Sequence, residues 1–243
     1  MISVSLSHPG FVRQNNEDCI RTDDKLGIYL LADGMGGHNA GEVASALAVD
    51  NAFAALSPKI ENTAVDCLPE LMENAMYAVH LEISTKARTG LSFMGMGTTL
   101  VIVVVRESTA YVAHAGDSRC YHFSSSRHLK QITKDHTMGD QLLAHGIPRE
   151  QISEKQFHNL TQAVGCGEPP IPDFNTVELN QSDMLLLCSD GLTDMLTDAE
   201  IEAVLSNEYD NFKTLAENLI DAANAKGGWD NVSVVLVKSP CKM

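Results

Sequence analysis

Three short apolar segments of the chain each adjoin an aspartate at a glycine turn. Gly27–Ala32 and Met184–Cys188 lead into Asp33 and Asp190, each of which precedes a glycine. Asp230 follows two glycines and directly precedes the third apolar segment. Short apolar runs bounded by such turns predict buried strands. If the third strand runs antiparallel to the other two, all three carboxylates meet at one edge of the core.

A gathering of carboxylates at that edge favours a metal site. Uncompensated, their charges repel and their pKa values rise, and a divalent cation removes that cost. Mg²⁺ and Mn²⁺ prefer oxygen ligands, and Gly34 lets a backbone carbonyl approach the same ion. Any single Asp-Gly pair is more often an ordinary turn. It is the joint pattern that favours the metal site.

Two further aspartates fit either a ligand role or a structural one. Asp117 lies between two predicted strands, where it is a ligand or a hairpin-turn residue. Asp194 follows Asp190 by four residues, so a helix there would place both carboxylates on one face. The alternative for Asp194 is a charged residue on a helix surface.

Arg13 introduces a different chemistry. It lies shortly before the acidic pair Glu17 and Asp18. A guanidinium fork matches two oxygens of a phosphate. Taken alone, an arginine near such carboxylates more often only forms salt bridges with them.

The remaining pattern predicts strands and helices in alternating groups, an α+β domain of sheets covered by helices. The strands expected are Ile2–His8, Gly97–Val105, Ala110–Ala115, Ser118–Phe123 and Asn231–Val237. The helices expected are Ala40–Leu56, Asp66–Arg88, one opened by a capping box at Thr197 and Glu200, and Phe212–Ala225. The polar stretch 135–174 is expected to hold at most one short helix, near Gln141. It is a functional flap or a solvated surface loop.

Six short motifs occur along the chain, in this order: Arg13-x-x-Asn16-Glu17-Asp18, Asp33-Gly34-Met35-Gly36-Gly37, Gly97-Thr98-Thr99, His114-x-Gly116-Asp117-Ser118-Arg119, Ser189-Asp190-Gly191-x-x-Asp194 and Trp229-Asp230-Asn231. Together they resemble the metal-dependent protein phosphatases of type 2C, above all the compact bacterial members. The resemblance covers essentially the whole chain. It implies one catalytic domain over residues 1–243 with a flap at 135–174. The implied fold is an α+β four-layer α-β-β-α sandwich, in which helix pairs flank two antiparallel sheets with a metal centre at one end.

The resemblance also implies the site and its reaction. Two Mn²⁺ or Mg²⁺ ions would share a hydroxide that hydrolyses phosphoserine or phosphothreonine in proteins, opposing a serine/threonine kinase. A third, weaker ion is also implied. The implied residues are Asp33, Asp190, Asp230 and the Gly34 carbonyl as ligands, Glu17 and Asp18 holding metal-bound waters, Asp117 and Asp194 with Asp190 at the third ion, and Arg13 binding phosphate.

The chain differs from many relatives at the position proposed to donate a proton to the leaving group. Many of them carry histidine directly after the Asp-Gly pair, where this chain has Met35. His38 is a candidate acid nearby, and a metal-bound water is the preferred donor.

Composition restricts the partners. The 243 residues include 17 Lys and Arg against 32 Asp and Glu, a net charge of −15. That balance disfavours general nucleic-acid binding and anionic membrane surfaces. The six cysteines are scattered without a Cys-x-x-Cys pair, which suits the reducing cytoplasm. The expected protein is a cytoplasmic monomer whose partners are phosphorylated proteins and a cognate kinase.

Two other function classes are weighed against this one. Gly116-Asp117-Ser118 is also typical of some serine esterases, but the last histidine is His158, so a late Asp-x-x-His is missing. A binding module without turnover could keep the same scaffold. Every matched metal-ligand side chain is still aspartate, which favours an enzyme.

Overall fold

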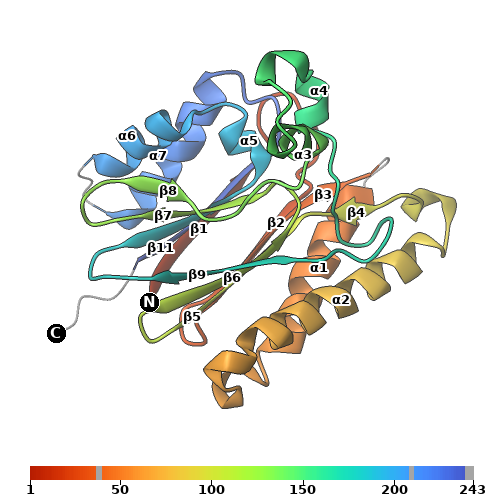
Figure 1. The fold of residues 1–243 in the computed structure, drawn as a ribbon, viewed down its shortest axis with the longest axis horizontal. Helices are drawn as coiled ribbons and strands as arrows, with labels where there is room; N and C mark the ends of the chain where they lie inside the picture. The colour runs from red at the N-terminus through yellow and green to blue at the C-terminus, as the bar shows by residue number, and fades with distance from the viewer. Residues whose placement is uncertain (37–39, 208–210, 239–243) are drawn as a thin grey trace.

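The computed structural model describes residues 1–36, 40–207 and 211–238. Two antiparallel sheets lie face to face, with helices on the outer side of each (Figure 1). One sheet has the strand order β1-β11-β10-β7-β8 and the other has β2-β3-β5-β6-β9, with β4 pairing β3. The predicted α+β four-layer sandwich is confirmed.

The strands are β1 (Ile2–His8), β2 (Asp18–Asp23), β3 (Ile28–Met35), β4 (Gly97–Thr98), β5 (Leu100–Arg106), β6 (Thr109–Ala115), β7 (Arg119–Phe123), β8 (Leu129–Gln131), β9 (Asp173–Glu178), β10 (Met184–Cys188) and β11 (Val232–Lys238). The helices are α1 (Ala40–Leu56), α2 (Leu68–Ala87), α3 (Met138–Ala144), α4 (Glu154–Phe157), α5 (Asp190–Thr193), α6 (Asp198–Ser206) and α7 (Phe212–Ala225). Single 3₁₀ turns occur at Ile60–Asn62, Val65–Cys67, Leu91–Phe93 and Arg149–Gln151.

The central strands are apolar on both faces because each sheet is covered on both sides. In β5, Leu100, Ile102 and Val104 pack with α1 and α2, whereas Val101 and Val103 point into the layer between the sheets. Successive side chains of a strand alternate between its two faces. The strands therefore appear in the sequence as continuous apolar runs rather than as alternating patterns.

The helices cover the outer faces in two groups, as Figure 1 shows. Helices α1 and α2 pack on the β2-to-β9 sheet, and α6 and α7 pack on the other. The predicted capping box opens α6, with Thr197 accepting from the Glu200 backbone and the Glu200 side chain accepting in return. None of the described helices is long and apolar enough to cross a membrane.

Strand β2 was not predicted, and β3 is longer than expected. The β2 sequence carries three charged residues and all its positions are half-buried, so it shows no apolar run. Strand β3 continues through Asp33 and Gly34 to Met35. Asp18 in β2 faces Asp33 in β3 as an antiparallel pair.

Residues 135–174, which we call the polar excursion, hold more secondary structure than the single short helix expected. They contain α3 and α4, and Asp173 already belongs to β9. Thr137 pairs with Leu160 in an isolated bridge that closes the base of this excursion. Phe157 packs against Gly139 within it. A local cluster this small leaves no recognisable periodicity in a polar sequence.

Candidate metal centre

The three predicted aspartates converge at one end of the sandwich. Asp33 lies near the end of β3, Asp190 follows β10, and Asp230 precedes β11, which runs antiparallel to β10. All three line one open cavity of about 500 Å³. The convergence expected from the sequence is therefore found in the fold.

Most of the other proposed residues line the same cavity. They are Arg13, Glu17, Gly34, Asp117 and Asp194. Asp18 lies beside them, and its Oδ2 accepts a hydrogen bond of 2.7 Å from the Ser189 hydroxyl. His38 falls outside the described residues, whereas Met35 is part of the cavity wall.

Among the described residues, two buried carboxylate oxygens at this end have no hydrogen-bond partner. They are Asp18 Oδ1 and Asp190 Oδ1. Buried polar atoms are nearly always satisfied, so each unsatisfied one calls for an explanation. A cation bound nearby, directly or through its waters, would satisfy such oxygens, because carboxylates are the ligands that hard divalent ions prefer.

Burial and mutual repulsion raise the pKa values of these carboxyls. Burial, followed by the charge of Asp18, raises the pKa of Asp33 well above its ordinary value. Burial and then Asp117 do the same to the pKa of Asp190. Burial also raises the pKa of Asp18 to about 6 and that of Asp117 to about 7. The cluster therefore resists carrying its full charge unless a cation compensates it.

The glycine after Asp33 is required by close packing. A Cβ on Gly34 would lie 2.1 Å from the Gly41 carbonyl oxygen. The Gly34 N–H donates to the Glu17 carbonyl at 3.0 Å. This contact holds the acidic loop before β2 against the end of β3, so the backbone of Gly34 and the Glu17 side chain share one cavity.

Thr99 fixes the backbone of Asp33. The Asp33 N–H donates to Thr99 Oγ1 at 2.9 Å, and the Thr99 N–H donates to the Asp33 carbonyl at 2.9 Å. Thr99 Oγ1 also lies 2.8 Å from the Ser118 hydroxyl. The Gly-Thr-Thr motif thus links Asp33 to the turn that carries Asp117.

Asp117 and Asp194 extend the cluster toward a second, smaller cavity of about 260 Å³, which both line together with Asp190. The Asp194 N–H donates to the Asp190 carbonyl at 2.7 Å, so the two lie one helical turn apart, as expected. His158 Nδ1 is 3.6 Å from Asp194 Oδ2. No sequence signal pointed to His158, which comes from the polar excursion.

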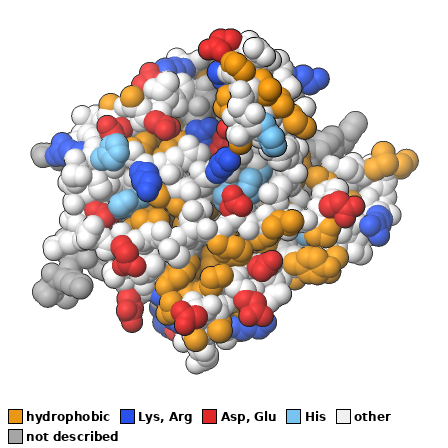
Figure 2. All heavy atoms as spheres, viewed as in Figure 1, with side chains coloured by type: hydrophobic (Ala, Val, Ile, Leu, Met, Phe, Trp, Pro, Cys, Tyr) orange, Lys and Arg blue, Asp and Glu red, His pale blue; other side chains and the backbone are white. Residues whose placement is uncertain are grey.

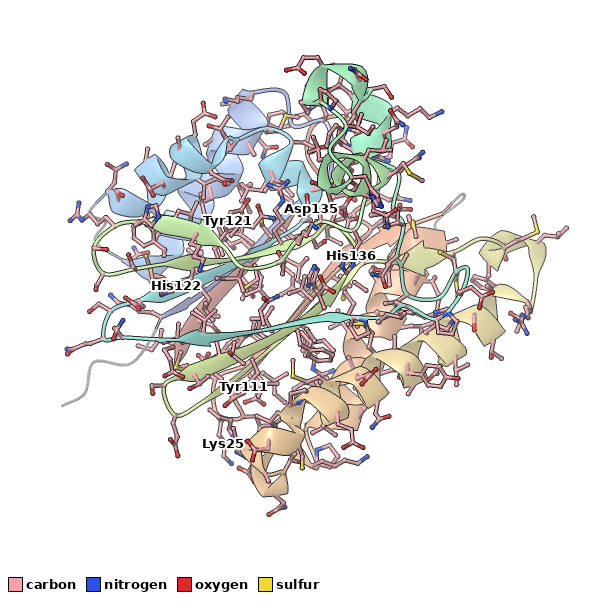
Figure 3. The ribbon with its side chains drawn as sticks, viewed as in Figure 1. Lys25, Tyr111, Tyr121, His122, Asp135 and His136 are labelled. Carbon is pink, nitrogen blue, oxygen red and sulfur yellow. The ribbon has the colours of Figure 1, made fainter. Side chains whose placement is uncertain are left out.

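A largely buried ion pair supports the Asp117 turn. Arg119 donates to both carboxylate oxygens of Asp135, at 2.9 Å and 2.7 Å. Arg119 also donates to the Tyr121 hydroxyl at 2.9 Å. Figure 3 shows Asp135 at this end of the sandwich beneath α3, next to His136. The Gly116 N–H donates to His136 Nδ1 at 3.2 Å, which ties the start of the excursion to the turn.

Arg13 forms a salt bridge in the structure. Its Nη2 donates to Asp230 Oδ2 at 2.6 Å, and about half of its side chain remains exposed. Asn231 holds the loop that carries it, donating to the Pro9 and Asn15 carbonyls and accepting from the Glu17 N–H. The Asp-Asn pair before β11 thereby fastens the arginine loop to the carboxylate cluster.

The fold and the cavity define a class of phosphatases known from solved structures. The serine/threonine phosphatase of S. agalactiae superposes with a TM-score of 0.86 at 32% identity, over 97% of this chain and 98% of that one. The catalytic domain of the serine/threonine protein phosphatase PstP, solved in complex with two manganese ions, superposes with a TM-score of 0.82 at 34% identity, over 97% of this chain and 96% of that one.

The sequence comparisons agree with the structural ones. A family model for protein phosphatase 2C matches residues 9–231. The serine/threonine phosphatase stp of Listeria innocua is 36% identical over 237 residues, covering 94% of this chain and 92% of that protein. The chain belongs to the protein phosphatase 2C family, whose members are metal-dependent, and it is a protein-serine/threonine phosphatase.

Proposed function

We propose that this end of the sandwich holds two Mn²⁺ or Mg²⁺ ions and a third, weaker one. The observation that carries this is the pair of unpartnered buried oxygens, Asp18 Oδ1 and Asp190 Oδ1. The manganese complex of PstP supports the count of two. The residues that would hold the ions are Asp33, Asp190, Asp230 and the Gly34 carbonyl, with Glu17 and Asp18 acting through water and Asp117 and Asp194 joining Asp190 at the third position.

When bound, such ions lower the pKa of a water molecule toward neutrality and neutralise charge on phosphoryl oxygens. Arg13 would bind the phosphate, because Asp230 fixes one end of the guanidinium and is its one side-chain partner among the described residues, which leaves further N–H groups to donate. Ser189 keeps Asp18 Oδ2 engaged, and Oδ1 is the oxygen left without a hydrogen-bond partner among the described residues. Met35 has no proton to give, so we assign the proton on the leaving oxygen to water.

The substrates are proteins phosphorylated on serine or threonine, and the enzyme opposes the serine/threonine kinase that makes those esters. All the described residues that we assign to the site belong to this chain, so a monomer with a single catalytic domain would suffice for the proposed reaction. The excursion over 135–174 acts as its flap, because its residues His158 and Leu160 form part of the cavity wall. The cysteines in the described part are all free thiols, which supports action in the cytoplasm.

The deciding experiment is phosphate release from a phosphothreonine peptide by the purified chain. We expect turnover with Mn²⁺ and none in EDTA. Asp190→Asn should lower kcat by about 100-fold or more, because it removes a carboxylate shared by the ion positions. Asp66→Asn, an exposed aspartate outside the cavity, is the matched control and should keep full activity. Turnover that survives EDTA undiminished would refute the metal centre.

A further inference from the structure

Three large apolar side chains stand exposed beside the catalytic cavity. Phe11 is 70% exposed, Val12 63% and Trp229 65%. Trp229 is the single tryptophan of the chain. We call these three residues the apolar ledge. Scattered exposed apolar side chains are ordinary, but a group of them beside a functional pocket marks a binding surface.

The two loops that form the ledge are fastened to each other. The Phe11 N–H donates to the Gly228 carbonyl at 2.7 Å. Gly10 has φ +75°, and a Cβ there would lie 2.3 Å from the Asp230 carbonyl oxygen, so only glycine fits this contact. The Phe11 ring meets His8 edge-on, with ring centroids 5.9 Å apart. The apolar surface is thus held in place toward solvent by close backbone packing.

The ledge is continuous with the catalytic cavity. Trp229 lines that cavity and directly precedes Asp230, while Val12 directly precedes Arg13, which also lines it. Consecutive Cα atoms lie about 3.8 Å apart, and an extended peptide advances about 3.3 Å per residue. A peptide with its phosphate at Arg13 therefore brings residues within about two positions of the phosphoresidue over the ledge.

We infer that the apolar ledge binds an apolar side chain flanking the phosphorylated residue of a protein substrate, and so determines which phosphorylation sites the enzyme prefers. The inference rests on the proposed function, since it takes the phosphate to bind at Arg13. The residues that flank the phosphorylated one in a protein substrate have to cross the rim of the cavity. The ledge forms the part of that rim next to Arg13.

Charge supports an apolar contact at this position. The chain carries a net charge of −15, so its overall field does not attract a phosphorylated peptide. On the face in Figure 2, the Lys and Arg side chains lie apart from one another and form no continuous basic area. The segments Gly10–Val12 and Gly227–Trp229 contain no acidic residue. The ledge therefore attracts substrate by burying apolar surface, and it carries no negative charge that would repel the phosphate.

The test compares two phosphothreonine peptides that differ only in the residues flanking the phosphothreonine, which are leucine in one and serine in the other. We expect wild-type kcat/KM to favour the leucine peptide by about tenfold, equal to about 1.4 kcal/mol. Phe11→Ser combined with Val12→Ser should bring that ratio close to one. The matched control is Leu91→Ser, which removes an 88% exposed leucine outside the cavity and should leave the ratio unchanged.

A second measurement needs no variant. Trp229 fluorescence of the wild-type protein, read with Mg²⁺ and with peptides in which a non-hydrolysable phosphonate replaces the phosphate, should shift to shorter wavelength when the leucine peptide is added. The serine peptide should give no shift at equal concentration. Because Trp229 is the single tryptophan, the signal reports the ledge alone.

The outcomes separate this inference from the function on which it rests. If the wild-type chain does not hydrolyse p-nitrophenyl phosphate in the presence of Mn²⁺, the proposed function itself is wrong. If that small ester is hydrolysed but the two peptides have equal kcat/KM, only the role of the ledge is refuted. An unchanged fluorescence spectrum with the leucine peptide would refute it too. A sedimentation change in the Phe11 and Val12 variant without a change in peptide ratio would also overturn it, in favour of contact between two copies of the chain.

Discussion

Asp18 and Asp33 face each other directly across the antiparallel pair of β2 and β3. Like charges placed opposite each other on neighbouring strands are destabilising. The fold nevertheless keeps both carboxyls at the end of the sheet, where the Asp18 charge contributes to the raised pKa of Asp33. The pair is therefore a source of instability in the absence of a cation, and a cation bound beside it would relieve the repulsion.

The pH dependence of stability follows from the raised pKa values. Asp18 titrates at about 6 and Asp117 at about 7 in the folded protein, against 3.8 for an ordinary aspartate. The folded protein thus holds protons that the unfolded chain has released. Their stabilising contribution is complete below about pH 4 and is lost as pH rises through these two pKa values.

In EDTA we therefore expect Tm to fall by several degrees between about pH 5 and about pH 8. Saturating Mn²⁺ should remove most of that fall, because the ion takes the place of the protons. Calorimetry across this pH range at constant ionic strength measures both curves. Parallel curves with and without Mn²⁺ would show that the carboxyls do not bind the ion.

Asp117→Asn should remove one weakly bound ion. Asp117 lines both cavities, and Asp33 and Asp230 line only the first; the second cavity brings Asp117 together with Asp190 and Asp194. We expect the Mn²⁺ stoichiometry from calorimetric titration to drop by one. The Tm in EDTA should stay level or rise, because asparagine removes a carboxyl whose pKa is already raised. An unchanged stoichiometry would place the third ion elsewhere.

Arg13→Ala should act on substrate binding. The guanidinium is half-exposed and paired to Asp230, so its loss should change stability little. We expect KM for a phosphate ester to rise by about tenfold, with a smaller change in kcat. Steady-state kinetics with Arg13→Lys as the conservative comparison checks the assignment. An unchanged KM would remove Arg13 from the phosphate site.

Gly34→Ala should destabilise the fold. The added Cβ would meet the Gly41 carbonyl oxygen at 2.1 Å, a backbone atom that cannot swing away. We expect a loss of about 3 kcal/mol in the free energy of unfolding by urea. Gly90→Ala is the matched control, because its Cβ meets nothing closer than 3.9 Å and its backbone is extended. Equal stability of the two variants would contradict the packing argument.

The layered fold could be predicted because its central strands and helices bury whole faces. Helices α1 and α7 and strand β10 occupy the residues expected from apolar spacing alone. The convergence of Asp33, Asp190 and Asp230 followed from strand direction, which needs no side-chain detail. Strand β2 was missed because a half-buried strand with three charges has no apolar run.

Other parts of the site depend on contacts that no local pattern encodes. His158 reaches Asp194 from 36 residues before it along the chain, through an excursion held by its own small cluster. The sequence left two interpretations open for Arg13, and the structure shows its salt bridge to Asp230. The exposure of Trp229 depends on how the loop of Gly10 meets the loop of Gly227 and Gly228, which only the folded backbone determines.

The two sheets contribute opposite halves of the carboxylate cluster. Asp33 comes from the β2-to-β9 sheet, whereas Asp190 and Asp230 flank β10 and β11 of the other. Any cation that binds all three carboxylates acts as a removable cross-link between the layers, and its binding free energy adds to that of their docking. Binding of such a cation would then stabilise the folded enzyme as well as serve its reaction.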